Sequence, residues 1–112
     1  MIDQVRPSDL AAWFAQNADA TPVLLDVREP WELQTASVAP QGFTLLAIPM
    51  NEVPARLAEI DDGQRIACLC HHGARSQRVA AFLSQNGLAE VANVAGGIDA
   101  WSAQHDAAVP RY

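Results

Sequence analysis

Short apolar runs recur along the chain with the length of buried strands. The clearest is Val23–Val27, which is apolar except for Asp26 and is typical of a strand buried on both faces. Three further segments are expected to be strands, at Ile2–Val5, Arg65–Leu69 and Val91–Val94. The weakly patterned segment Thr35–Ala47 is expected to be a loop, with a short strand near Leu45–Ile48.

Between these runs lie stretches in which apolar residues recur every three or four positions, as on an amphipathic helix. Five segments are expected to be helical, at Leu10–Asn17, Glu29–Leu33, Val53–Ile60, Gln77–Asn86 and Ile98–Gln104. The third is expected to open around Pro54, and Trp101 in the last is expected to face the core. Because strands alternate with helices, the sequence predicts an α/β fold with a mostly parallel sheet.

The charge of the chain argues against one class of partner. Its 112 residues carry 13 acidic and 7 basic side chains, which gives a formal net charge of −6. Phosphate backbones are bound by clustered Lys and Arg, so no nucleic-acid partner is expected. No apolar run approaches the length needed to span a membrane, and the first residues lack the pattern of a signal peptide.

The two cysteines differ in their predicted positions. Cys68 lies within the apolar run Arg65–Leu69 and is expected to be a core residue, whereas Cys70 follows the end of that run. They are too close along one strand for an unstrained disulfide. Free thiols are typical of reducing compartments, so we expect a cytoplasmic protein.

The most distinctive stretch begins at the second cysteine and reads Cys70-His71-His72-Gly73-Ala74-Arg75-Ser76. It joins a predicted strand to a predicted helix, where free N–H groups and the positive end of the helix dipole favour an anion. The thiolate is the reactive form of cysteine, so the pattern predicts a nucleophilic Cys70. Gly73 is expected to adopt the unusual dihedral angles that converging N–H groups require.

The charged neighbours of Cys70 allow more than one interpretation. Arg75 either pairs with a nearby acid at the start of the helix or turns inward and attracts an anionic substrate, and we favour the second. His71 and His72 either fill space or add positive potential beside the sulfur. We expect no metal site, because Cys70, His71 and His72 on one tight turn cannot easily aim at one ion, and we expect no cofactor.

Asp26 and Arg28 flank Val27 at the end of a predicted strand. A buried acid has to be hydrogen-bonded or paired, so we expect the two residues to support the loops around the site. A direct contact with the substrate is the alternative.

Four motifs, in order over nearly the whole chain, resemble those of the single-domain rhodanese family: Leu25–Glu29, Ile48-Pro49, Cys70–Arg75 and Gly96–Trp101. The resemblance implies one rhodanese-like α/β domain over residues 1–112, with a mostly parallel central sheet of about five strands flanked by helices on both faces. It also implies a sulfurtransferase of the thiosulfate sulfurtransferase type, in which Cys70 takes sulfane sulfur, becomes a persulfide and passes the sulfur to a thiophilic acceptor. The amides of His71–Ser76 would hold the persulfide and the anionic group of the donor.

Two other classes share parts of this pattern. Cysteine-dependent phosphatases and arsenate reductases also use a cysteine in an anion-binding loop that ends in arginine, but the rhodanese-fold phosphatases have one residue more than the four between Cys70 and Arg75 here. A non-catalytic rhodanese-like binding module typically lacks the cysteine, whereas a sulfur-relay module keeps it. The expected partners are a small-molecule sulfur donor and acceptor or a protein persulfide, and the oligomeric state stays open.

Overall fold

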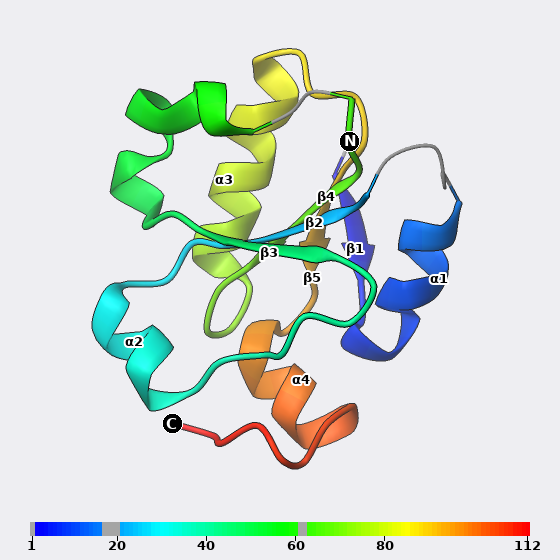
Figure 1. Ribbon diagram of the computed structural model, residues 1–112, viewed down its shortest axis with the longest axis vertical. Helices are drawn as coiled ribbons and strands as arrows, with labels where there is room; N and C mark the ends of the chain where they lie inside the picture. Colours follow the sequence, from blue (N-terminus) through cyan, green and yellow to red (C-terminus); the bar gives the residue numbers. More distant parts are fainter. Residues whose placement is uncertain (1, 17–20, 61–62) are drawn as a thin grey trace.

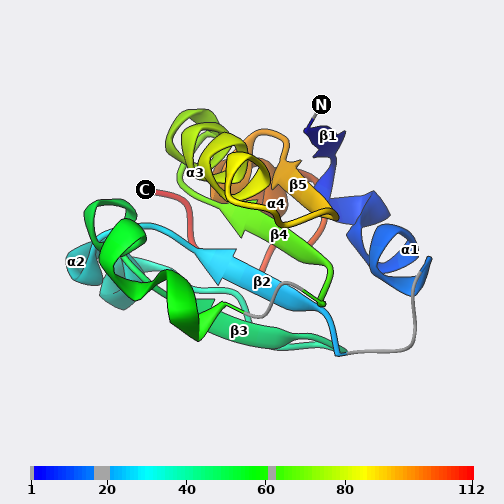
Figure 2. The ribbon, with the colours of Figure 1, turned by 90° about the horizontal axis from the view of Figure 1, so that it is seen from above.

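A parallel sheet forms the centre of the protein, whose computed structural model describes residues 2–16, 21–60 and 63–112. The sheet has five strands in the order β1-β5-β4-β2-β3, and every neighbouring pair is parallel. The strands are β1 (Asp3–Val5), β2 (Val23–Asp26), β3 (Thr44–Ala47), β4 (Ile66–Leu69) and β5 (Val91–Val94). Their carboxyl ends therefore meet at one edge, toward which the arrowheads in Figure 2 point and beyond which α2 and the last residues lie.

Helices connect the strands and cover both faces of the sheet, as predicted. The α-helices are α1 (Leu10–Ala15), α2 (Pro30–Thr35), α3 (Ala74–Gln85) and α4 (Gly97–Gln104). Three short 3₁₀ helices are η1 (Pro7–Asp9), η2 (Met50–Glu52) and η3 (Pro54–Glu59). Figure 1 shows α1 and α3 on opposite sides of the strands.

Two separate cores lie on the two faces because side chains alternate along each strand. Leu24, Ala67 and Ala92 are aligned across neighbouring strands and pack with residues of α1 and α4. Leu25 and Cys68 point the other way and pack with α3, η2 and η3. Trp101, on α4, belongs to the first core and is buried, which confirms its predicted orientation.

The segment Val53–Ile60 differs from its prediction as an α-helix. It forms 3₁₀ turns, and Arg56 within η3 has non-helical angles of φ −113° and ψ 18°. Pro54 at the first position of η3 is compatible with either helix type, so the break in α-helical geometry lies at Arg56. Val53 and Ile60 are nevertheless both buried, so the predicted apolar face is correct although the helix type is wrong.

Element boundaries shift slightly elsewhere. The strand predicted near Leu45–Ile48 is β3, which begins and ends one residue earlier. The predicted end of the first helix, Asn17, lies outside the described residues. Within the described part of the chain, no helix combines the length and the apolar character needed to cross a membrane.

Candidate active site

Cys70 lies directly after β4, at the carboxyl edge of the sheet, as predicted. This edge is where open α/β sheets bind their ligands. The cysteine is almost completely buried, with 1% of its surface exposed. A reactive sulfur at this position is thus shielded from bulk water.

One backbone donor and one hydroxyl group contact the sulfur. The Gly73 N–H donates a hydrogen bond to Cys70 Sγ at 3.0 Å, and the Ser76 hydroxyl lies 3.2 Å from the same atom. A donor held beside a sulfur stabilises negative charge that develops there during a reaction. This pair of contacts makes Cys70 the best-supported nucleophile among the described residues.

The loop around the sulfur is shorter than the sequence predicts. Helix α3 begins at Ala74 rather than Gln77, so Ala74, Arg75 and Ser76 form its first turn. Gly73 is the N-cap of this helix, and its φ of +108° is a left-handed conformation that favours glycine. The free N–H groups of a first helical turn consequently lie next to Cys70.

Helix α4 fixes the other side of the loop. The Ile98 N–H donates to Cys70 O at 2.8 Å, and the Asp99 N–H donates to His71 O at 3.1 Å. Gly97 permits this contact, because a Cβ at that position would collide with the carbonyl oxygens of Cys70 and His71. The glycine pair of the fourth motif thus has a packing role beside the cysteine.

Asn93, on β5, is a site residue that the sequence analysis missed. Its Nδ2 donates to Gly73 O at 3.1 Å and to Gln4 Oε1 at 3.0 Å, which leaves Oδ1 to accept a hydrogen bond from Ser76 at 2.5 Å. One buried amide therefore holds both groups that contact the sulfur. The sequence analysis placed it within the predicted strand Val91–Val94 and gave it no role.

Arg75 forms an ion pair with Glu32, another residue that the sequence analysis missed. Both guanidinium nitrogens, NH1 and NH2, lie 2.7 Å from a carboxylate oxygen. This geometry matches the first of the two interpretations of Arg75, pairing with a nearby acid. An interaction of the same side chain with a substrate stays a prediction.

Glu32 is held in its ionised form. The hydrogen bonds from Arg75, the Glu29 N–H and the Tyr112 hydroxyl lower the pKa of Glu32 from 4.5 to about 2, although burial opposes them. The Glu29 N–H bond, at 2.9 Å, also caps α2. The charge of the pair is thus maintained down to strongly acidic pH.

Asp26 and Arg28 are paired and buried, as expected of a supporting role. The Arg28 guanidinium donates to both carboxylate oxygens of Asp26, at 2.9 and 2.7 Å. It also donates to Glu32 O at 3.2 Å and to the Tyr112 hydroxyl at 3.1 Å. Arg28 is completely buried among these groups, which favours bracing of the loops over contact with a substrate.

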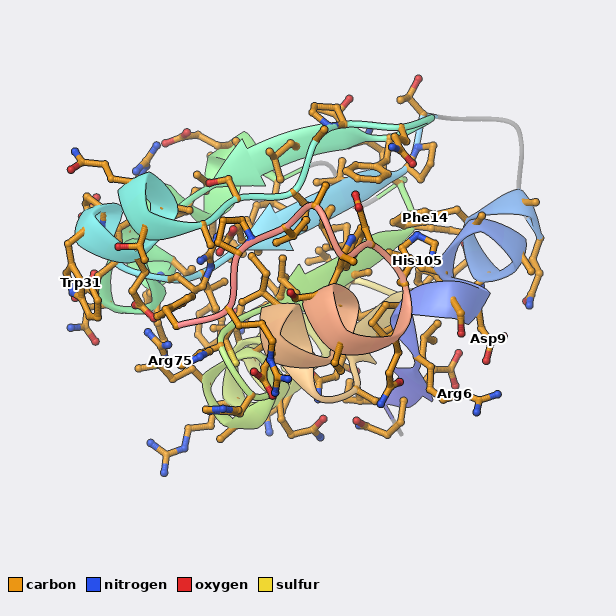
Figure 3. The ribbon with its side chains drawn as sticks, turned by 90° about the horizontal axis from the view of Figure 1, so that it is seen from below. Arg6, Asp9, Phe14, Trp31, Arg75 and His105 are labelled. Carbon is orange, nitrogen blue, oxygen red and sulfur yellow. The ribbon has the colours of Figure 1, made fainter. Side chains whose placement is uncertain are left out.

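Tyr112 links these charged groups to the loop. Its hydroxyl donates to Glu32 at 2.9 Å, and its ring stacks on His71 with ring centres 3.9 Å apart. The Tyr112 ring also makes an edge-on contact with the ring of Trp31, whose surface is 63% exposed. Figure 3 shows Trp31 and Arg75 on the same side of the molecule, from α2 and α3.

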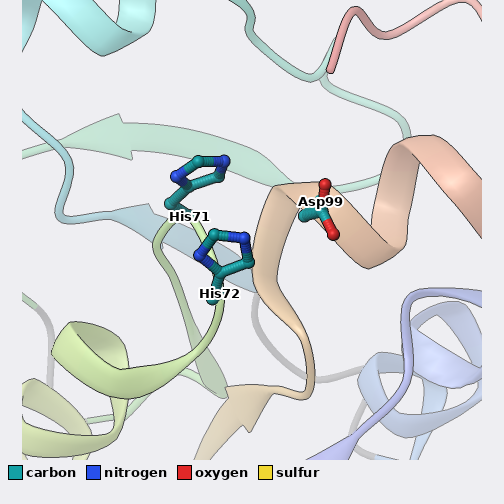
Figure 4. Close-up of side chains that lie close together, drawn as sticks. All are labelled: His71, His72 and Asp99. Carbon is teal, nitrogen blue, oxygen red and sulfur yellow. The ribbon is translucent and has the colours of Figure 1, made fainter. Parts of the chain in front are cut away.

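His71 and His72 follow Cys70 directly in the chain. Their rings stack on one another with centres 3.9 Å apart, and His72 is exposed. Asp99, from α4, reaches the same two rings (Figure 4). The expectation of no metal site considered only the run from Cys70 to His72 and did not include this carboxylate.

Cys68 has no access to the site. It lies in the middle of β4 with none of its surface exposed, and burial raises the pKa of its thiol. Both cysteines are free thiols. The predicted core role of Cys68 is confirmed.

Comparison with known proteins gives a consistent picture. The family model of the rhodanese-like domain matches residues 10–104. A sulfurtransferase of Allochromatium vinosum is 31% identical over 91% of this chain and 90% of its own length. A putative sulfur carrier protein of Bacillus subtilis is 33% identical over 80% of this chain, which spans only 47% of that relative. A rhodanese-related protein from Thermoplasma volcanium has a crystal structure that superimposes with a TM-score of 0.73, at 34% identity, over 92% of this chain and 93% of its own. The chain therefore belongs to the rhodanese-like domain family.

Proposed function

We propose that this protein is a sulfurtransferase that carries sulfane sulfur as a persulfide on Cys70. The observation that carries the proposal is the Gly73 N–H, which donates to Cys70 Sγ beside the first turn of α3, with Ser76 Oγ 3.2 Å from the same sulfur. Family membership supports it, and so do relatives named as a sulfurtransferase and a putative sulfur carrier. Two free thiols fit a reducing, cytoplasmic setting.

The first half-reaction uses Cys70 as nucleophile. The thiolate attacks the outer sulfur of thiosulfate, a new S–S bond forms, and sulfite leaves with the electron pair of the bond that breaks. With a persulfide donor, the donor's thiolate leaves instead. The Gly73 N–H stabilises the negative charge on sulfur, since a donor fixed where charge develops needs no rearrangement during the reaction. The Ser76 hydroxyl adds a second hydrogen bond when its single proton turns from Asn93 Oδ1 to the sulfur.

The second half-reaction returns the enzyme to its starting state. A thiophilic acceptor, such as cyanide or a thiolate, attacks the terminal sulfur of the persulfide. The S–S bond breaks, and its electron pair returns to Cys70 as the thiolate. The N–H groups of His71–Ser76 are the proposed binding groups for the persulfide and for the anionic part of the donor.

A phosphatase or arsenate reductase is less well supported. A phosphoryl group needs donors for three oxygens around an in-line attack. Arg75 is the basic residue that follows Cys70, and both of its terminal nitrogens already donate hydrogen bonds to Glu32 rather than toward a phosphoryl group. A sulfur relay between proteins remains compatible with the same Cys70 chemistry, and the putative sulfur carrier among the relatives favours it as the second candidate.

The proposal is tested by two parallel assays on the same preparation. Thiocyanate formation from thiosulfate and cyanide is expected, together with no turnover of an aryl phosphate. The Cys70→Ser variant should form no thiocyanate. Phosphatase activity that depends on Cys70, without thiocyanate formation, would contradict the proposal.

A further inference from the structure

Three metal-ligating side chains meet beside the loop, on the side of His71. The donor atoms of His71, His72 and Asp99 all lie within 4.8 Å of one another. Figure 4 shows both imidazole rings reaching from the loop toward the Asp99 carboxylate on α4. The hydrogen bond from the Asp99 N–H to His71 O holds the two backbone segments together, so the cluster does not depend on side-chain packing alone.

One ring nitrogen in this cluster is unsatisfied. His71 Nε2 is buried and has no hydrogen-bond partner among the described residues. The ring is covered on its two faces by His72 and Tyr112. Buried polar atoms in proteins are nearly always paired, and an orphan of this kind points to a bound group.

The chemistry of the three donors selects the class of that group. Two imidazole nitrogens and one carboxylate oxygen form a set that suits zinc and similar divalent transition metals. From these observations we propose that His71, His72 and Asp99 bind a divalent transition-metal ion that fastens the loop after Cys70 to the start of α4. The proposal does not depend on sulfur transfer, because it uses none of the groups that contact the sulfur.

The donors have to close up around the ion. Tetrahedral zinc with bonds of about 2.0–2.1 Å places its donor atoms roughly 3.4 Å apart. The two rings now stack at an angle of 28°, and imidazole lone pairs lie in the ring plane, so His72 has to leave the stack. His72 is exposed, and Asp99 is part of the first turn of α4 and partly exposed, so both side chains can turn toward His71.

Asp99 is available as a ligand although it has a partner. Arg111 donates to both of its carboxylate oxygens, at 3.1 and 3.2 Å. The Arg111 side chain is 61% exposed, and exposed ion pairs contribute little to stability. The hydrogen bond and the charge of Arg111 lower the pKa of Asp99.

The test measures metal binding in a Cys70→Ser background without a polyhistidine tag. This background removes the sulfur of Cys70, which adjoins His71 in the chain, and Cys68 is fully buried. Calorimetric titration with Zn²⁺ is expected to show one ion per chain, with a dissociation constant below about 10 μM. Co²⁺ in place of Zn²⁺ should give the absorption bands of a tetrahedral site, and Zn²⁺ should raise the melting temperature.

Matched variants locate the ion. His72→Ala and Asp99→Asn should each weaken Zn²⁺ binding by at least about tenfold. His105→Ala, which removes an exposed histidine outside the cluster, should bind as the parent does. Arg111→Gln should bind at least as tightly, because it frees Asp99, and this separates loss of the ligand from loss of the ion pair.

Two results would overturn the proposal. The first is no binding by the Cys70→Ser protein at about 100 μM Zn²⁺ in the titration, the melting experiment or the Co²⁺ spectrum. The second is equal binding by the parent and by folded His72→Ala and Asp99→Asn variants. Circular dichroism of each variant identifies those that are folded. The first result does not depend on the folding of the variants, because the Cys70→Ser protein retains His71, His72 and Asp99.

Discussion

The Arg75 guanidinium and the Glu32 carboxylate form a two-pronged ion pair with both N–O distances at 2.7 Å. It joins α2 to the first turn of α3, and the carboxylate side is nearly buried while Arg75 is 31% exposed. The positive charge of Arg75 is therefore already matched by an acid. The group that donates directly to Cys70 Sγ is the Gly73 N–H, not Arg75.

Acid should weaken the fold through Glu32. Its pKa is lower in the folded protein, about 2 against an ordinary 4.5, so its stabilising contribution is complete above about pH 5 and is lost as the pH falls toward 2. Glu32→Gln should cost on the order of 2–3 kcal/mol near neutral pH and much less at low pH. Urea unfolding at a series of pH values measures this.

The matched control is Glu59→Gln, which removes an exposed carboxylate that pairs with Arg56. It should change stability little at any pH, because exposed ion pairs are weak. If Glu32→Gln and Glu59→Gln had the same pH dependence as the parent, the Arg75–Glu32 pair would have no special role in stability.

Asn93→Ala should lower sulfur-transfer activity although the residue does not touch the sulfur. The substitution removes the hydrogen bonds of Asn93 to Gly73 O and to the Ser76 hydroxyl, which hold the two residues that contact Cys70 Sγ. We expect a loss of roughly tenfold in kcat/KM, the equivalent of one or two hydrogen bonds. Steady-state thiocyanate formation by folded protein measures it.

A double-mutant cycle with Ser76→Ala separates positioning from a general loss of stability. If Asn93 acts through Ser76, the double variant should lose clearly less activity than the two single losses combined. Fully additive losses would show that Asn93 does not act by positioning Ser76.

Cys68→Ala should keep activity close to that of the parent. The residue is buried on the face of β4 that packs against α3, and it has no exposed surface. Removing its sulfur leaves a small cavity, so we expect a loss of about 1–2 kcal/mol in the free energy of unfolding. Loss of activity by a folded Cys68→Ala variant would instead indicate a dithiol mechanism.

Arg75→Gln tests whether Arg75 only pairs with Glu32 or also attracts thiosulfate as the anionic donor. The substitution leaves the Glu32 carboxylate unpaired near the site, and the resulting repulsion should reduce kcat/KM by roughly tenfold. Adding Glu32→Gln should then restore most of the activity. A double variant as slow as Arg75→Gln would show that Arg75 itself attracts the donor, as first predicted.

Much of the fold follows from local patterns. The alternation of apolar runs and amphipathic stretches predicted the parallel α/β sheet, because each strand and helix is specified by its own residues. The segment around Pro54 was mispredicted as an α-helix because residue spacing alone does not separate 3₁₀ turns from an α-helix. Its apolar face, with Val53 and Ile60, was nevertheless correct.

The partners of the site residues were harder to predict because they are distant in sequence. Cys70 was identified from its own surroundings, but Asn93 lies 17 residues from Ser76 and Glu32 lies 43 residues from Arg75. Tyr112 is 80 residues from Glu32. The sequence indicates which residues are candidates for the chemistry, whereas contacts between residues this far apart can be found only once the fold is known.

The most direct test of the central proposal is the mass of the protein after incubation with thiosulfate. The intact mass should increase by one sulfur atom, peptide mapping should place that sulfur on Cys70, and cyanide should remove it again. Cys68→Ala should give the same result, and Cys70→Ser should gain no sulfur. A protein that gains no sulfur from thiosulfate or from a low-molecular-weight persulfide, or that gains it at Cys68, would contradict persulfide transfer through Cys70.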